Sequence, residues 1–138
     1  MTHSIEPTDY QARVLEIPEN YDVLECGGRG GGKTYAEGLA ILRHVEIHGA
    51  KARELFVRKT FAGLRDFEMV LRELFGAAYG TRATFNSQEH LWRLPNGATV
   101  ELNQVEGPAD LHKFQGRSFT LLCADEVGQS ARRRRCAC

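Results

Sequence analysis

The glycine-rich stretch Gly27–Thr34 constrains the fold of this chain more than any other feature of its sequence. It reads G-G-R-G-G-G-K-T and matches the phosphate-binding loop pattern G-x-x-x-x-G-K-[ST]. Such a loop joins a buried strand to a helix, because backbone N–H groups and the positive helix end then surround the phosphates. The flanking sequence fits: Tyr21–Cys26 is strand-like, and a helical pattern over about 32–48 stops at Gly49.

The rest of the sequence alternates strand-like and helical patterns. Glu54–Arg58 is strand-like, and Phe119–Ala124 is a near-continuous apolar run, as in parallel strands buried on both faces. Thr60 is a candidate N-cap for a helix between them. The alternation predicts an α/β fold of the P-loop NTPase kind, with a mainly parallel sheet flanked by helices and a β-hairpin insertion. Further expected elements are a helix over Asp9–Leu15, strands at Arg82–Asn86, His90–Leu94 and Ala98–Leu102, and a turn or short helix at Ala109–Phe114.

The apolar spacing predicts which side of each long helix is buried. The expected buried positions are Ala36, Leu39, Ala40, Ile41 and Val45 in the first helix, and Leu64, Phe67, Val70, Leu71 and Leu74 in the second.

The loop residues have distinct expected tasks in binding ATP and Mg²⁺. Lys33 would reach the β- and γ-phosphates, and the Thr34 hydroxyl would bind Mg²⁺. The alternative is a glycine-rich turn followed by a chance Lys-Thr pair. Glycines leave room for inward-pointing N–H groups, and those expected to contact the nucleotide are Gly27, Gly28, Gly30, Gly31 and Gly32.

Two polar residues near the loop have two interpretations each. Arg29 either stabilises charge at the γ-phosphate, and so acts in catalysis, or is an exposed loop arginine. Gln11 either contacts the adenine edge or serves as the third residue of a capping box with Thr8. The two interpretations of Gln11 are compatible.

An acidic pair follows the last apolar run. Asp125, at the tip of a buried strand, is the candidate Mg²⁺ residue. Glu126 would orient or deprotonate the attacking water. The alternative is that these are ordinary acidic residues at a strand end.

Composition and charge limit the class of protein. The chain has 138 residues, enough for one domain with a real core, and no apolar run near the ~20 residues that span a bilayer. Met1–Pro7 has no features of a secretory signal, so a cytosolic protein is expected. Without the four arginines at 132–135, 14 basic residues face 18 acidic ones, which argues against a strongly basic nucleic-acid reader.

The four cysteines give no sign of a metal site. Cys26 and Cys123 lie in strand-like runs and are expected to be small buried residues. Cys136 and Cys138 have no second Cys/His cluster nearby, so a zinc site is not expected.

Taken in order, several stretches resemble the ATPase domain of phage large terminase subunits over roughly residues 5–130. They are P-T-D-Y-Q-A-R-V-L, L-E-C-G-G-R-G-G-G-K-T, F-V-R-K-T-F-A-G-L-R-D-F, L-P-N-G-A-T-V-E-L and H-K-F-Q-G-R-S-F-T-L-L-C-A-D-E-V. The resemblance implies an adenine contact for Gln11, and phosphate and Mg²⁺ contacts for Lys33 and Thr34. It also implies a catalytic loop arginine, Arg29, and a metal and catalytic pair in the two acidic residues.

The resemblance also implies partners and a location. Large terminases drive DNA into a prohead as rings on the portal protein, fed by a small terminase subunit. The expected partners are therefore double-stranded DNA, the portal protein, the small terminase subunit and further copies of the chain. The expected location is the host cytoplasm, with the gene carried by a phage or prophage and no membrane attachment.

The sequence departs from that family at its end. The family carries further strands, a coupling motif and an RNase H-like nuclease domain, whereas only twelve residues follow Glu126 here. We therefore expect a C-terminally incomplete ATPase domain over 1–130, no nuclease domain, and little activity from this chain alone. Residues 131–138 read A-R-R-R-R-C-A-C. An out-of-frame tail is favoured there, with a basic DNA-contacting tail and a fragment boundary as alternatives.

Two other functions stay open. One is a stand-alone nucleotide-binding module that acts on an intact motor. The other is a different P-loop enzyme such as a small kinase, although no arginine-bearing lid or acceptor pocket is visible in the sequence.

Overall fold

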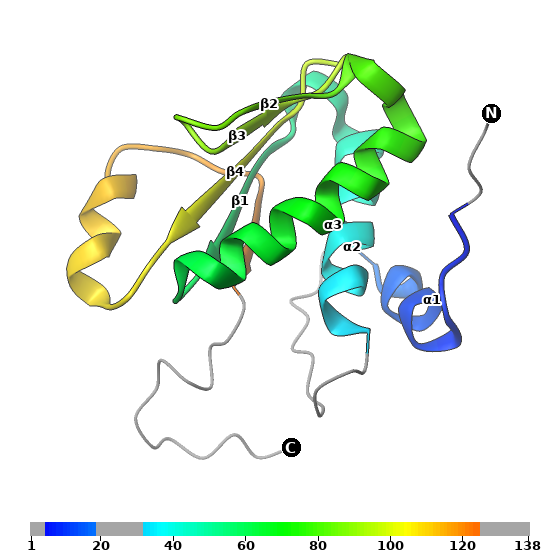
Figure 1. The fold of residues 1–138 in the computed structure, drawn as a ribbon, viewed down its shortest axis with the longest axis horizontal. Coiled ribbons are helices and arrows are strands. Elements are labelled where there is room, and N and C mark those ends of the chain that lie inside the picture. Colours follow the sequence, from blue (N-terminus) through cyan, green and yellow to red (C-terminus); the bar gives the residue numbers. More distant parts are fainter. Residues whose placement is uncertain (1–4, 19–31, 125–138) are drawn as a thin grey trace.

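A computed structural model of the chain describes residues 5–18 and 32–124. In that part the fold is α/β, a five-stranded mixed sheet flanked by helices (Figure 1). The helices are α1 (Asp9–Glu16), α2 (Lys33–His48) and α3 (Phe61–Tyr79), and the 3₁₀ turns are η1 (Gly49–Lys51), η2 (Gly80–Arg82) and η3 (Pro108–Phe114). The strands are β1 (Arg53–Arg58), β2 (Thr84–Asn86), β3 (Leu91–Arg93), β4 (Thr99–Gln104) and β5 (Leu121–Ala124).

The described sheet is mixed, where the sequence predicted a mainly parallel sheet with a β-hairpin insertion. Its strand order is β2-β3-β4-β1-β5. β1 runs parallel to both β4 and β5, but β3 is antiparallel to β2 and to β4. The antiparallel pairing of β2, β3 and β4 follows from the length of the segments between them, because these short connections suffice for hairpins but not for parallel crossovers. The expected strand Tyr21–Cys26 lies outside the described residues.

The helix ends confirm the local signals in the sequence. Thr8 and Gln11 form the predicted capping box: Gln11 N donates to Thr8 Oγ1 at 3.3 Å, and Thr8 N donates to Gln11 Oε1 at 2.9 Å. Thr60 caps α3 by accepting from Gly63 N at 3.2 Å. α2 ends at Gly49, whose φ of 56° lies in the region that favours glycine.

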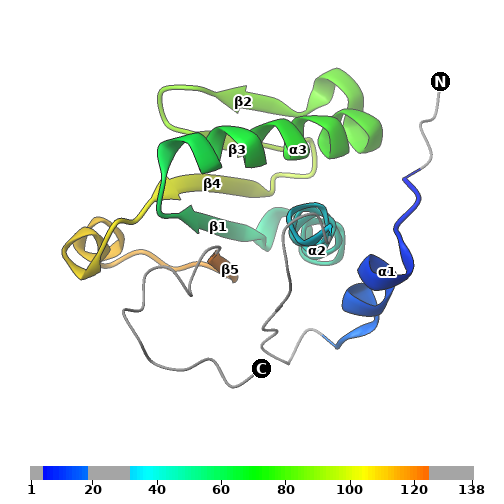
Figure 2. The same cartoon turned by 60° about the horizontal axis from the view of Figure 1, so that its bottom comes forward.

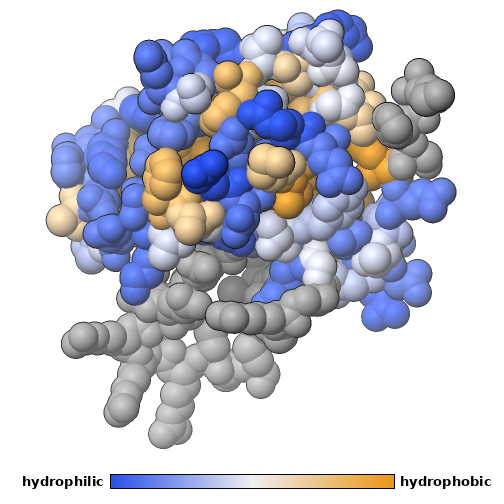
Figure 3. Space-filling model, viewed as in Figure 1, coloured by the Kyte–Doolittle hydropathy of each residue, from blue (hydrophilic) through white to orange (hydrophobic). Residues whose placement is uncertain are grey.

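The core lies between one face of the sheet and the packed pair α2 and α3. Figure 2 shows α3 lying over the sheet and running roughly along its strands, with α2 beside it and α1 against α2. Phe56 of β1 stacks on Phe67 of α3 with ring centroids 3.6 Å apart. The predicted buried side of each helix is confirmed except at Ala40 and Val70, which are half-buried. On the face shown in Figure 3, apolar side chains are interrupted by hydrophilic ones.

β5 differs from the expected strand buried on both faces. Leu121 and Cys123 pack against the core, but Leu122 between them is 62% exposed. Alternation along a strand explains this, because Leu122 points to the face opposite to the one that α2 and α3 cover. Cys123 is therefore a half-buried residue, and Cys26 lies outside the described residues.

Gly38 marks a close approach of α2 to α3, which the sequence did not reveal. A Cβ there would lie 2.7 Å from Leu74 Cδ1 and 3.2 Å from Val70 Cγ1. We expect Gly38→Val to lower the free energy of unfolding by about 1–3 kcal/mol through overpacking. Gly76→Ala is the matched control: a Cβ at Gly76 meets nothing within 4 Å, so better helix propensity should raise stability by about 0.5–1 kcal/mol.

The measurement for both glycine variants is urea unfolding followed by the fluorescence of the single tryptophan, Trp92, which is 3% exposed. Equal stability of Gly38→Val and the wild type would show that the two helices do not pack as described.

Within residues 5–18 and 32–124, no helix combines the length and apolar character that crossing a membrane requires.

Candidate functional site

The structure describes one part of the predicted site, the end of the glycine loop. Gln11, Gly32, Lys33 and Thr34 lie within the described residues. The other predicted residues lie outside them, so their expected roles stay predictions. These residues are Gly27, Gly28, Arg29, Gly30, Gly31, Asp125 and Glu126, together with the tail 131–138.

The first turn of α2 begins directly at the loop end. Gly32 is its N-cap, in the left-handed conformation with φ 76°, and makes no side-chain capping hydrogen bond. The other two α-helices of the described part both have threonine side-chain caps. Lys33 and Thr34 are the first two helical residues. The positive end of the α2 dipole therefore points toward the segment where the motif places phosphate.

Gln11 contacts this helix start. It is 4% exposed, and its Nε2 donates to the carbonyl oxygen of Gly32 at 3.3 Å. A Cβ at Gly32 would lie 3.0 Å from that nitrogen, so glycine allows the approach. Because its Oε1 accepts the capping-box hydrogen bond, the amide keeps one hydrogen and one lone pair for another partner. The capping interpretation is confirmed, and the adenine contact stays a prediction.

Arg58 also belongs to this region, although the sequence analysis did not single it out. It is the last residue of β1, and its side chain is 9% exposed. Its Nη2 donates to Thr34 Oγ1 at 3.4 Å, and its Nη1 donates to the Gly63 carbonyl oxygen at 2.7 Å. The available signal was an arginine at the carboxyl end of an apolar strand, since ligands of α/β sheets bind at that edge.

The strand that leads to the acidic pair ends at the same edge. Val57 of β1 pairs with Ala124, the last residue of β5, in parallel register. Figure 1 shows the carboxyl ends of β1 and β5 and the start of α2 on the same side of the molecule. The described residues thus place the chain immediately before Asp125 at the sheet edge where Arg58 meets Thr34.

Tyr35 follows Thr34 in the first turn of α2. Burial, and then the negative charge of Glu73, raises the pKa of the Tyr35 hydroxyl above its ordinary value of 10.0. Tyr35 is therefore neutral at physiological pH and adds no charge beside Lys33 and Arg58.

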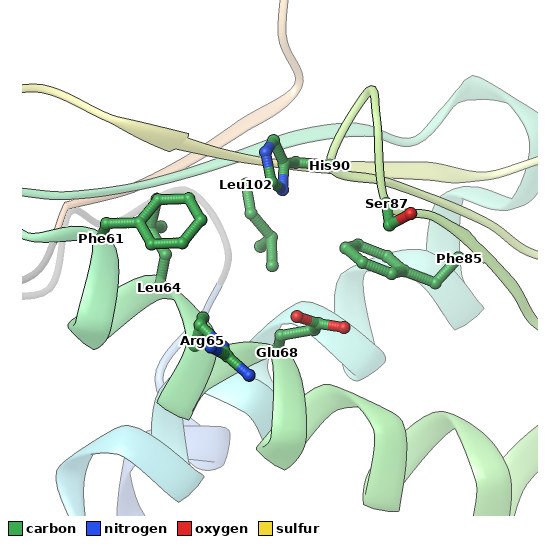
Figure 4. Close-up of a pocket in the computed structure, with 8 residues that line it drawn as sticks. All are labelled: Phe61, Leu64, Arg65, Glu68, Phe85, Ser87, His90 and Leu102. Carbon is green, nitrogen blue, oxygen red and sulfur yellow. The ribbon is translucent and has the colours of Figure 1, made fainter.

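A separate hollow of about 240 Å³ lies between α3 and the β2–β3 hairpin (Figure 4). Phe61 and Arg65 line it from α3, and Phe85 and His90 line it from the hairpin side. Of the four site residues that the structure describes, Gln11, Gly32, Lys33 and Thr34, none lines this hollow. Across the described ranges, no group of three or more His, Cys, Asp or Glu side chains is placed to hold a metal ion.

Comparison of the chain with protein-family models, curated proteins and solved structures gave no match. Its function is therefore inferred from its motifs and from the geometry of the described residues.

Proposed function

We propose that this chain binds ATP and Mg²⁺ and is the ATPase part of a phage DNA-packaging motor of the large terminase type. One observation carries the nucleotide site. The G-x-x-x-x-G-K-T motif leads into α2, whose first turn lies at the sheet edge where β5 ends, and Asp125 and Glu126 come next in the sequence. A phosphate loop and an acidic strand end at one edge are the parts that ATP hydrolysis requires.

The residues of this edge fit ATP and Mg²⁺ chemically. The α2 N-terminus has no side-chain cap, and Lys33 and Thr34 supply a cation and a hydroxyl in its first turn. In the proposed site Lys33 binds the β- and γ-phosphates, Thr34 and Asp125 hold Mg²⁺, and Arg29 stabilises charge at the γ-phosphate. Mg²⁺ would neutralise the charge that develops between the β- and γ-phosphates.

In this proposal Glu126 directs the hydrolytic water. The water oxygen forms a bond to the γ-phosphorus while the bond from that phosphorus to the β,γ-bridging oxygen breaks. Glu126 orients the water and accepts its proton. Gln11, which is anchored to Gly32, would face the adenine with the free part of its amide.

The packaging role rests on the ordered set of motifs that resembles large terminases. As in that family, the proposed partners are double-stranded DNA, a portal protein and a small terminase subunit, with the motor working as a ring. Two described features are compatible with the resemblance. The R-K-T stretch begins at the last residue of strand β1, and the P-N-G turn joins β3 to β4 with Gly97 at φ 92°.

The test of this role uses the Glu126→Gln variant to separate ATP binding from ATP hydrolysis. We expect Glu126→Gln to keep ATP·Mg²⁺ affinity within about twofold in calorimetry, because the amide keeps the side-chain size. Turnover is measured as steady-state ATP hydrolysis with and without double-stranded DNA. DNA should stimulate the hydrolysis, and the substitution should slow it by about 10²–10⁴-fold.

Glu89→Gln is the matched control, because Glu89 is an exposed hairpin carboxylate whose ion pair with Arg93 has both side chains 55% exposed. It should change neither affinity nor rate. If the Glu126→Gln variant hydrolyses ATP at the full rate, Glu126 is not the base. A hydrolysis rate that does not change with DNA would contradict the packaging role.

A further inference from the structure

We propose that Arg58 is a positioning residue of the nucleotide site, which fixes the Thr34 hydroxyl for Mg²⁺ and ties the start of α2 to the start of α3. This inference rests on the proposed function, because Mg²⁺ binding by Thr34 belongs to it. It adds a residue of strand β1 to a site that the sequence placed on the glycine loop and the acidic pair.

The guanidinium of Arg58 joins two helix starts. Its Nη1 donates to the Gly63 carbonyl oxygen in the first turn of α3 at 2.7 Å, a short and buried contact. Its Nη2 donates to Thr34 Oγ1 in the first turn of α2 at 3.4 Å, a longer contact. Because a guanidinium is planar and rigid, the strong bond to Gly63 sets the direction of the nitrogen that faces Thr34.

The surroundings of Arg58 leave its side chain little freedom. The guanidinium carbon lies 5.8 Å from the centroid of the Phe56 ring, and the side chain is 9% exposed. Gly63 provides the space for this position: a Cβ there would lie 2.7 Å from Arg58 Cδ and 3.3 Å from Nη1. The close approach of the Arg58 side chain to position 63 thus explains why this position of α3 is glycine.

The hydrogen-bond chemistry of Thr34 shows what this contact does. A threonine hydroxyl has one hydrogen and two lone pairs. When Arg58 donates to one lone pair, the second lone pair is left for a metal ion and the hydrogen for an acceptor. Arg58 thereby selects one orientation of the hydroxyl before the nucleotide arrives. Its effect should appear only when Mg²⁺ is present, unlike that of a cation that binds phosphate directly.

The test compares ATP affinity of the full chain with Mg²⁺ and in EDTA, measured by calorimetry. Arg58→Lys keeps the charge but cannot reach both acceptors at once, and Gly63→Ala displaces the arginine without removing it. Both should weaken ATP·Mg²⁺ binding about three- to tenfold, the range for one hydrogen bond. Both should leave ATP affinity in EDTA within about twofold of wild type. Gly76→Ala, on the open side of the same helix, should change neither affinity.

A double variant shows whether the effect passes through Thr34. With Thr34→Val in place, Arg58→Lys should cause no further loss of ATP·Mg²⁺ affinity. Additive losses, or equal losses with Mg²⁺ and in EDTA, would overturn the positioning role. Trp92 fluorescence reports whether each variant is folded. A folded wild type that binds no ATP would refute the proposed function itself, an outcome distinct from normal binding that Arg58 does not affect.

Discussion

Phe67→Ala is expected to lower the free energy of unfolding by about 3–5 kcal/mol, the range for removing a buried aromatic ring. Phe67 is 0% exposed, and its ring stacks on that of Phe56 at an interplanar angle of 10°. This contact joins α3 to β1 at the centre of the core. Because the net stability of a domain is about 5–15 kcal/mol, the loss would remove a large share of it.

Phe61→Ala is the matched control for this prediction. Phe61 lies on the same helix but is 51% exposed, so its loss should cost about 1 kcal/mol or less. Urea unfolding followed by Trp92 fluorescence measures both. Equal losses for the two variants would show that the stacked pair does not hold the core as described.

Lys33→Ala is expected to weaken ATP·Mg²⁺ binding about ten- to a hundredfold. The lysine ammonium would make charge-assisted contacts to phosphate, and losing such a contact costs about 1.5–3 kcal/mol. Displacement of a fluorescent ATP analogue measures the affinity. Lys51→Ala is the matched control, since Lys51 is an exposed lysine beyond the opposite end of α2. Unchanged affinity in the Lys33 variant would show that the loop does not bind phosphate.

The sequence predicted those parts of the fold that depend on neighbouring residues. The capping box of Thr8 and Gln11, the Thr60 cap and the glycine stop at Gly49 all act within one turn of chain. Apolar periodicity likewise located α2 and α3 and eight of their twelve buried positions, the missed ones being Gly38, His44, Gly63 and Phe75. These signals are local, so they can be read without knowing which distant segments meet.

The features that the sequence missed depend on contacts between distant segments. The exposure of Leu122 depends on which face of the sheet α2 and α3 cover. The expected hairpin joins the parallel strands in one mixed sheet through the pairing of β4 with β1, which also links distant segments. The tight packing at Gly38 similarly depends on the way α2 meets α3.

In the candidate site, too, the local motifs could be predicted and the contacts between distant segments could not. The glycine loop and the acidic pair are continuous motifs that can be predicted from the residues alone, and their roles stay predictions. The contact of Gln11 with Gly32 spans 21 residues, and that of Arg58 with Thr34 spans 24. Spacing alone does not predict such pairs, because a strand arginine reaches a helix start only when the sheet edge brings them together.

Calorimetric titration of the full chain with ATP and Mg²⁺ tests the central claim, nucleotide binding at the start of α2, most directly. We predict saturable binding of one ATP per chain, weaker binding in EDTA, and a loss of about ten- to a hundredfold with Lys33→Ala. The chain must be shown to be folded by its Trp92 fluorescence in the same sample. A folded chain that binds no ATP, or one whose affinity does not change with Lys33→Ala, would contradict the proposal.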